Sequence, residues 1–276
     1  MVRRRPSPSF DLFSAYDWFI PGWIDFIALA AMLAVGFGMG VVTTLSMNRA
    51  GFAPIYIQLV SYPLLFIPSM LYASSMSRRS QFKKKYAPLD RSTHWTLPVA
   101  GVSVVAVLSA AMLCDPLAFV LPPMPESLRQ MMEALSGGPL WAGLLCTAVF
   151  APFFEEWLFR GIVLRGLLGK IGPLGAVLVS SLLFGLIHAN LWQGIPAFLM
   201  ALLFGYVYCK TGSLKLTMLM HAVNNAASIL LSRLPGASDM SSLRPLFPSA
   251  ALYAATLVVA ALFLVLSLRW FTQVKE

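Results

Sequence analysis

Charged residues are scarce in this chain of 276 residues: Asp, Glu, Lys and Arg make up 11%, whereas a soluble domain carries about 25%. Hydrophobic residues make up 58%, and the mean hydropathy is +0.76. No stretch is long and polar enough to form a second, water-soluble domain. Several apolar runs reach the roughly 20 residues that a membrane-spanning helix needs. The composition therefore excludes a large-core soluble protein and predicts one membrane domain.

Cysteine is also scarce, with three residues, Cys114, Cys146 and Cys209. Their number is odd, and each lies in or at the edge of an apolar segment. Cysteine at such positions behaves as a small hydrophobic residue. The sequence therefore predicts neither a disulfide framework nor a cysteine-based metal site.

Acidic residues are few, with 11 Asp and Glu against 20 Lys and Arg, which gives a net charge of +9. The basic residues gather in short loops and near the ends of the chain, where they set membrane topology and attract anionic lipid headgroups. This distribution predicts the lipid bilayer, and no nucleic acid, as a partner.

The apolar runs predict an all-α polytopic membrane protein with about eight transmembrane helices. The predicted spans are 23–45, 52–73, 96–121, 139–168, 173–191, 194–210, 215–233 and 249–269. With both termini in the cytoplasm, fifteen Lys and Arg residues lie on the cytoplasmic side and four on the other, as the positive-inside rule requires. We expect an integral protein of the inner or plasma membrane, if the host is a prokaryote.

The predicted domain organisation is a cytoplasmic tail at 1–22, a single membrane domain at 23–271 and a C-terminal tail at 272–276. The segment 122–138 contains three prolines and charges of both signs. We expect it to form a loop on the non-cytoplasmic side.

Two adjacent glutamates, Glu155 and Glu156, lie inside the apolar run 139–168. Ionisable groups at membrane depth are costly and usually line a functional site. Pro152 removes a backbone donor, so we expect the helix to break or restart just upstream of the pair. Glu156 and Arg160 have the i, i+4 spacing of an ion pair, which leaves Glu155 free for chemistry. The alternative is a purely structural ion-pair lock.

Two further acidic residues lie close to apolar segments, Asp25 at the start of the first predicted span and Asp115 near the end of the third. At the end of a span, water or a helix cap satisfies a carboxylate. We therefore expect a structural role for both residues.

Histidines and amides supply further polar groups within apolar runs. His188 ends such a run, with Phe184 one turn earlier on the same helical face. His221 and Asn225 are spaced i, i+4 and share a face, whereas Asn224 is one residue off it and is expected to pack or hydrogen-bond. Each group alone is typical of polar residues that hold membrane helices together. Together with the glutamate they indicate a site.

A carboxylate and an imidazole can orient a water molecule and remove its proton, which is general-base catalysis of hydrolysis. Glu155 with His188 fits this role. A second imidazole and an amide N–H can stabilise the oxyanion that forms when water attacks a carbonyl group. His221 with Asn225 fits that role.

A zinc ion is the alternative activator of the water, since zinc takes His and carboxylate ligands and keeps one position open. Its ligands would be Glu155, His188 and His221. The sequence contains no His-Glu-x-x-His helix, so the strongest sequence mark of such a site is missing. No cofactor is therefore assigned, and zinc stays an alternative.

Three segments resemble the motifs EExxxR, FxxxH and HxxxN of the CAAX protease and bacteriocin-processing (Abi) family, which includes the type II CAAX prenyl endopeptidases. They are Glu-Glu-Trp-Leu-Phe-Arg at 155–160, Phe-Gly-Leu-Ile-His at 184–188 and His-Ala-Val-Asn-Asn at 221–225. The resemblance covers residues 139–235, which is the expected protease core. It does not extend to the first three predicted spans or to the last one.

The resemblance implies an α-helical core around an intramembrane catalytic chamber open to the cytoplasmic side. It implies that Glu155 and His188 activate water, that His221 and Asn225 form the oxyanion hole, and that two residues, Glu156 and Arg160, support them. Metal-free and metal-dependent versions of this chemistry both stay open for this chain.

We therefore expect an intramembrane endopeptidase, glutamate-dependent or metal-dependent, that hydrolyses a peptide bond in a membrane-associated protein or peptide. The resemblance implies CAAX-type tails or bacteriocin, leader or signal peptides as substrates. The alternatives are a non-enzymatic immunity or scaffold protein and, third, a proton-coupled transporter. The sequence has no visible internal repeat, which disfavours the transporter.

Overall fold

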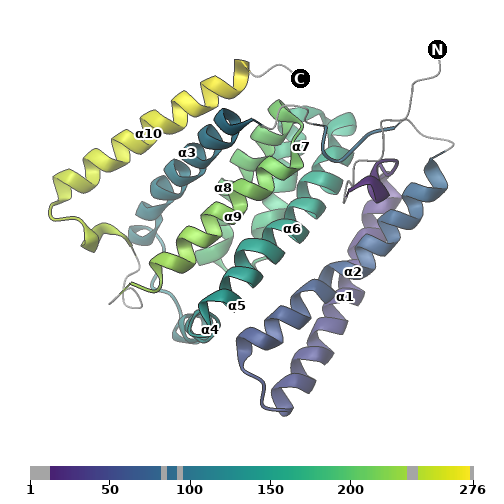
Figure 1. Cartoon of the computed structure of the whole chain (residues 1–276), viewed down its shortest axis with the longest axis horizontal. Helices are drawn as coiled ribbons and strands as arrows, with labels where there is room; N and C mark the ends of the chain where they lie inside the picture. The colour runs from purple at the N-terminus through teal and green to yellow at the C-terminus, as the bar shows by residue number, and fades with distance from the viewer. Residues whose placement is uncertain (1–12, 82–85, 92–95, 235–241, 274–276) are drawn as a thin grey trace.

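The computed structural model describes residues 13–81, 86–91, 96–234 and 242–273, so most of the two predicted tails lies outside the described residues. Within these ranges the chain is helical and has no strand, which confirms the predicted fold class (Figure 1). The principal helices are α1 (Trp23–Arg49), α2 (Pro54–Ser80), α3 (Leu97–Cys114), α4 (Glu126–Ser136), α5 (Leu140–Leu144), α6 (Ala151–Glu156), α7 (Arg165–Leu186), α8 (Leu191–Thr211), α9 (Leu214–Leu231) and α10 (Ala250–Gln273). The shorter elements are the 3-10 turns η1 (Ser14–Tyr16), η2 (Asp115–Phe119) and η6 (Arg244–Leu246) and the π-helical segments η3 (Leu145–Phe150) and η4 (Trp157–Leu164).

Six helical stretches within the described ranges are long and apolar enough to cross a membrane. They are Trp23–Arg49, Pro54–Ser80, Leu97–Phe119, Leu140–Leu186, Leu191–Thr211 and Ala250–Gln273. The fourth has 47 residues, and the non-helical backbone of Gly172 (φ 72°, ψ 168°) divides it just before Pro173. The seventh predicted span corresponds to α9, which is not among the six and carries His221, Asn224 and Asn225. Each of the eight predicted apolar segments is thus helical, although six stretches, rather than eight, qualify as spans.

The segment 122–138, predicted to be a loop, contains the helix α4, so that prediction was wrong. Glu126 lies in the first turn of α4, where the helix dipole favours negative charge. Arg129 pairs with Glu126 and Glu133 at 2.6 and 2.5 Å along the exposed face. The hydrogen bonds from Arg129 hold the pKa of the Glu126 carboxyl below its usual value. The prolines precede the helix rather than interrupt it.

The helices form three groups side by side (Figure 1). The hairpin of α1 and α2 lies at one edge, and the pair α3 and α10 lies at the opposite edge. The helices α5 to α9 fill the middle. Within the hairpin the two backbones touch, since a Cβ atom on Gly36 would lie 2.2 Å from the carbonyl oxygen of Leu65. This close approach lets α1 and α2 pack along their length, as small residues do in membranes.

A buried arginine holds two segments that lie outside the long helices, residues 13–22 and 86–91, over one end of the bundle. Arg165 is 8% exposed and donates to the carbonyl oxygens of Phe19 and Ala87. These bonds satisfy a charge that would be costly if it were buried without partners. They also fix the chain that leads into α1 against the helix that follows the glutamate pair.

Candidate active site

The glutamate pair lies on a continuous helix made of α5, η3, α6, η4 and the start of α7. In the π-helical segment η3 the N–H of Ala151 bonds to the carbonyl of Cys146, five residues earlier. The next donor in this pattern would come from Pro152, which has no N–H. The carbonyl of Thr147 therefore lacks a helical donor and accepts a hydrogen bond from Asn225 Nδ2 at 2.8 Å.

The predicted helix break at Pro152 was wrong. The wider π turn accommodates the proline, and the helix continues through the two glutamates without a restart. Such π segments are often found at functional sites, and here the segment η3 is linked to α9 by the side chain of Asn225.

Glu156 forms the predicted ion pair with Arg160. Arg160 Nη1 donates to Glu156 Oε1 at 2.8 Å, and both side chains are buried, with exposures of 1% and 0%. Arg160 Nη2 also donates to the carbonyl oxygen of Ala201 at 3.1 Å, which ties the pair to α8. The guanidinium carbon lies 4.8 Å and 5.3 Å from the ring centres of Phe184 and Phe204. The charge is thus satisfied by a carboxylate, a carbonyl and two aromatic faces.

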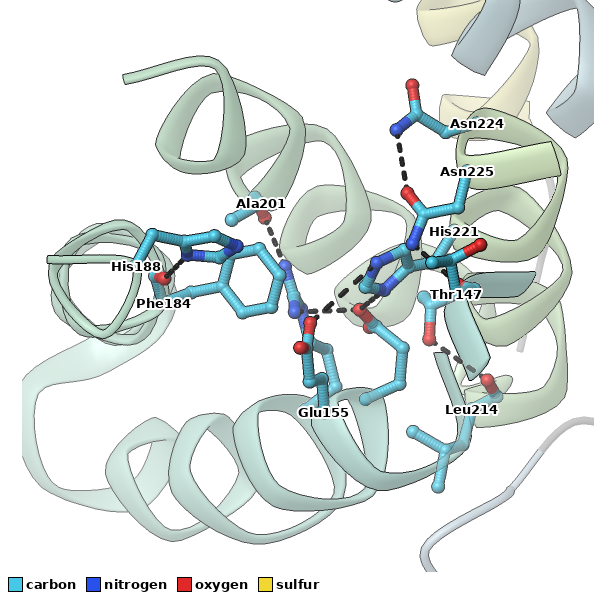
Figure 2. Close-up of polar contacts among 12 residues, drawn as sticks. Thr147, Glu155, Phe184, His188, Ala201, Leu214, His221, Asn224 and Asn225 are labelled. Carbon is cyan, nitrogen blue, oxygen red and sulfur yellow. Dashed lines mark hydrogen bonds and ion pairs between the residues drawn. The ribbon is translucent and has the colours of Figure 1, made fainter. Parts of the chain in front are cut away.

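His221 lies between the two glutamates. Its Nδ1 is 3.0 Å from Glu156 Oε1, and its Nε2 is 3.7 Å from Glu155 Oε2 (Figure 2). The ring stacks on Phe204 at 5.5 Å and meets the edge of Phe184 at 5.8 Å. Because the carboxylate of Glu156 accepts, Nδ1 carries the proton. The other ring nitrogen is therefore the one that faces Glu155.

His188 is half-buried and lies in the turn just after the end of α7. Its Nδ1 lies 2.9 Å from the carbonyl oxygen of Phe184, so that Nδ1 is the donor and Nε2 can accept. The next residue, Ala189, has a φ of 56°, which is uncommon for a residue with a side chain. Asn190 Nδ2 donates to the carbonyl oxygen of His188 at 2.8 Å, and the Asn190 side chain also caps α8. These contacts fix the turn that carries His188.

The predicted partner of Glu155 was His188, but in the structure Glu155 contacts other residues. Glu155 accepts a hydrogen bond from the Tyr62 hydroxyl at Oε1 and faces His221 at Oε2. Between Glu155 and His188, both of them described, there is no direct hydrogen bond or ion pair. His188 instead packs against Phe184 at 5.4 Å, the same ring that His221 touches. In Figure 2 the Glu155 carboxylate lies between the two imidazoles in projection.

His221 and Asn225 project from one face of α9, as their spacing predicts. Asn225 uses one amide N–H on Thr147 and accepts a hydrogen bond from Asn224 Nδ2 at 3.1 Å. Asn224 thus has the hydrogen-bonding role expected for a residue just off this face. These bonds fix the orientation of the Asn225 amide and leave its second N–H available.

Sequence reasoning did not identify Tyr62. This residue lies on α2, and its hydroxyl reaches Glu155 on α6. Tyr56 and Tyr72 lie on the same helix in similar apolar surroundings, and Tyr72 donates to Asp25 at 2.7 Å instead. Nothing in the spacing of these tyrosines marks Tyr62 as the one that meets a glutamate.

Comparisons with known proteins concern the segment that contains this site. Residues 137–227 match the family model described as type II CAAX prenyl endopeptidase Rce1-like. A protein of Bacillus subtilis (strain 168) named "Putative membrane peptidase YdiL" is 24% identical over 110 residues, which cover 40% of this chain and 44% of that protein. The chain thus spans less than half the length of this relative. No solved structure matches. The resemblance predicted from the three motifs is therefore confirmed, because the segment that holds the predicted catalytic groups is similar to the Rce1-like type II CAAX prenyl endopeptidases.

Proposed function

We propose that this integral membrane protein is an endopeptidase that cuts a peptide bond of a membrane-associated protein or peptide by means of an activated water molecule. The observation that carries the proposal is the arrangement of Glu155, His221 and Glu156 within the segment that matches the peptidase family. A buried imidazole flanked by two carboxylates can both hold water and stabilise charge.

Glu155 is the general base in this mechanism. Its Oε2 and His221 Nε2 are 3.7 Å apart, too far for a direct hydrogen bond, so Oε2 is open to accept a hydrogen bond from a water molecule. Glu155 takes the proton of this water during attack and returns it to the leaving amine. His188 Nε2, left unprotonated by the bond at Nδ1, can accept a hydrogen bond from the second O–H of the same water and orient it.

Asn225 and His221 stabilise the oxyanion. One N–H of the Asn225 amide bonds to Thr147, and the second is free to donate to the developing charge. His221 Nδ1 is already engaged with Glu156, so donation from Nε2 requires the imidazolium form. Glu156 and Arg160 act as supporting residues.

We place the chamber open to the cytoplasmic side, with both termini in the cytoplasm. A CAAX-type tail or a bacteriocin, leader or signal peptide is the substrate class that the family match supports. If the host is a prokaryote, the site lies in the inner or plasma membrane, and a CAAX substrate further requires a host that prenylates proteins.

A metal-dependent version is the second candidate, and one observation favours it. Both imidazoles bond through Nδ1 to a carboxylate or a carbonyl, an arrangement that directs Nε2 toward a metal ion. Zinc held by Glu155, His188 and His221 would polarise the water and the carbonyl group. Within the described residues no group of three His, Cys, Asp or Glu side chains is close enough to hold a metal. This version therefore requires His188 to move toward Glu155.

Mass spectrometry of membrane peptides tests the proposal. Cells that express the wild type should accumulate cleaved peptides that cells with Glu155→Gln or His188→Ala lack, at equal amounts of membrane-inserted protein. Glu126→Gln, an exposed carboxylate on α4, is the matched control and should cleave as the wild type does. Equal peptide profiles with wild type and Glu155→Gln would contradict the protease and favour the scaffold. Loss of cleavage with a chelator, and its recovery with zinc, would select the metal-dependent version.

A further inference from the structure

The two carboxylate oxygens of Glu155 have different surroundings. Oε1 accepts the hydrogen bond from the Tyr62 hydroxyl, and Oε2 faces His221 Nε2 at 3.7 Å. One oxygen is therefore held by α2, and the other is left for water. Tyr62 lies outside residues 137–227, so the family match does not include this contact.

The ring of Tyr62 has a fixed position. It packs against Phe66 on its own helix at 5.5 Å and against Phe154, the neighbour of Glu155, at 6.5 Å. It also contacts a small cluster of buried residues, which consists of Ile55, Ala142 and Cys146. These contacts restrict the side chain to the orientation that directs the hydroxyl at Glu155.

A glutamate in this position needs such a partner. The terminal torsion of a glutamate side chain is broad and roughly two-fold, so an unbonded carboxylate turns easily. An ionised carboxylate without donors is also costly at membrane depth. A hydroxyl that donates to one oxygen holds the torsion and stabilises the charge through a charge-assisted hydrogen bond.

We propose that Tyr62 is a positioning residue that orients the Glu155 carboxylate toward the reacting water and couples the α1–α2 hairpin to the catalytic site. This inference rests on the proposed function. The coupling follows from the packing: α2 is held against α1 where Gly36 meets the backbone of Leu65, so the position of the hairpin sets the position of the hydroxyl.

Tyr62→Phe tests the role, because it removes the hydroxyl and keeps the ring that packs on Phe66 and Phe154. Tyr72→Phe is the matched control, since it removes a phenol–carboxylate bond on the same helix, to Asp25, away from the site. Tyr62→Phe should lower the rate at which product peptides form by about tenfold, at unchanged protein level, since a hydrogen bond to a charged group is lost. Tyr72→Phe should leave that rate within about twofold.

A second readout is independent of proteolysis. Dicyclohexylcarbodiimide, an apolar reagent, modifies protonated carboxyl groups, and mass spectrometry gives the modified fraction of Glu155 with time. The Tyr62 hydroxyl occupies Oε1, so its loss in Tyr62→Phe leaves this oxygen open to the reagent and should increase the rate of modification by about tenfold. Tyr72→Phe should not change it.

The outcomes separate the two proposals. If Glu155→Gln abolishes cleavage while Tyr62→Phe matches the wild type in both readouts, the role of Tyr62 is wrong and the protease stands. If Glu155→Gln still cleaves, the proposed mechanism is wrong, and the carbodiimide rates alone decide whether Tyr62 holds Glu155. An equal effect of Tyr72→Phe would also overturn the inference, because it would show a general loss of α2 packing.

Discussion

Glu155 and Glu156 are neighbours in the chain, and helix geometry gives them different partners because successive side chains point about 100° apart. Glu156 is fully buried and bonds to Arg160 and His221. Glu155 keeps 8% exposure and meets the Tyr62 hydroxyl. In the proposed mechanism the more accessible carboxylate handles the proton. The buried one sets the orientation of His221.

The buried pair of Glu156 and Arg160 should be sensitive to the loss of one partner. Arg160→Met leaves the Glu156 charge without its cation, and we expect it to lower the free energy of unfolding by about 3–5 kcal/mol. The double variant Arg160→Met, Glu156→Gln should lose less free energy of unfolding than Arg160→Met alone, because it no longer buries an uncompensated charge. Thermal unfolding in detergent, followed by circular dichroism, measures both values.

Arg129→Met is the control for this pair, because Arg129 forms ion pairs on the exposed face of α4. Exposed pairs contribute little, so the midpoint of unfolding should hardly change. If Arg160→Met lowered the stability against unfolding no more than Arg129→Met does, the buried pair would not be a structural element of the site.

In the π-helical segment η3, one backbone carbonyl lacks a donor in its own helix and bonds to a neighbouring helix instead. Pro152 has no backbone N–H, so the Thr147 carbonyl receives no hydrogen bond from its own helix. Asn225 on α9 donates to this carbonyl instead. A helix in ordinary register would bond this carbonyl to its own backbone. The proline thus couples the helix that carries the base to the helix that carries the oxyanion-hole residues.

Pro152→Ala should therefore separate stability from activity. It supplies an N–H that can bond to Thr147, and it removes a residue that costs about 3 kcal/mol inside a helix. We expect unchanged or higher thermal stability, together with a loss of product formation of about tenfold as Asn225 loses its acceptor. The peptide assay and the unfolding assay on the same preparation measure both.

Pro68→Ala, at an interior position of α2, is the control for that variant. It should raise or keep stability and leave cleavage unchanged. Normal cleavage by Pro152→Ala would mean that the bond between Asn225 and Thr147 has no part in the reaction.

Spacing predicted the contacts within one helix, and it did not predict the contacts between helices. Glu156 with Arg160 follows from the i, i+4 spacing, and so does the shared face of His221 and Asn225. The bond from Tyr62 to Glu155 joins residues that are 93 positions apart. Such a contact depends on how two helices pack, which a single sequence does not encode in its local pattern.

The basic residues lie in two groups, at opposite ends of the helix bundle. Residues 13–22 and 86–91 join the ends of α2, α7, α8 and α9 at one end of the bundle. The contacts are Trp18 with Ser77, Arg165 with Ala87, Arg91 with Gly212, and Lys215 with Asp90. Arg233 bonds to the carbonyl of Gly138 at the other end. The end that carries more of the basic residues is the one that the positive-inside rule places in the cytoplasm.

Cysteine labelling tests this orientation. In a variant with Ala at Cys114, Cys146 and Cys209, a single cysteine replaces Asn48, at the exposed end of α1, or Gln81, at the exposed end of α2. We expect a membrane-impermeant maleimide to label Asn48→Cys in intact cells and to label Gln81→Cys after lysis alone. Because both positions are polar and uncharged, neither substitution alters the count of basic residues that determines topology. Labelling of Gln81→Cys in intact cells would reverse the orientation and place the end with residues 86–91 outside the cytoplasm.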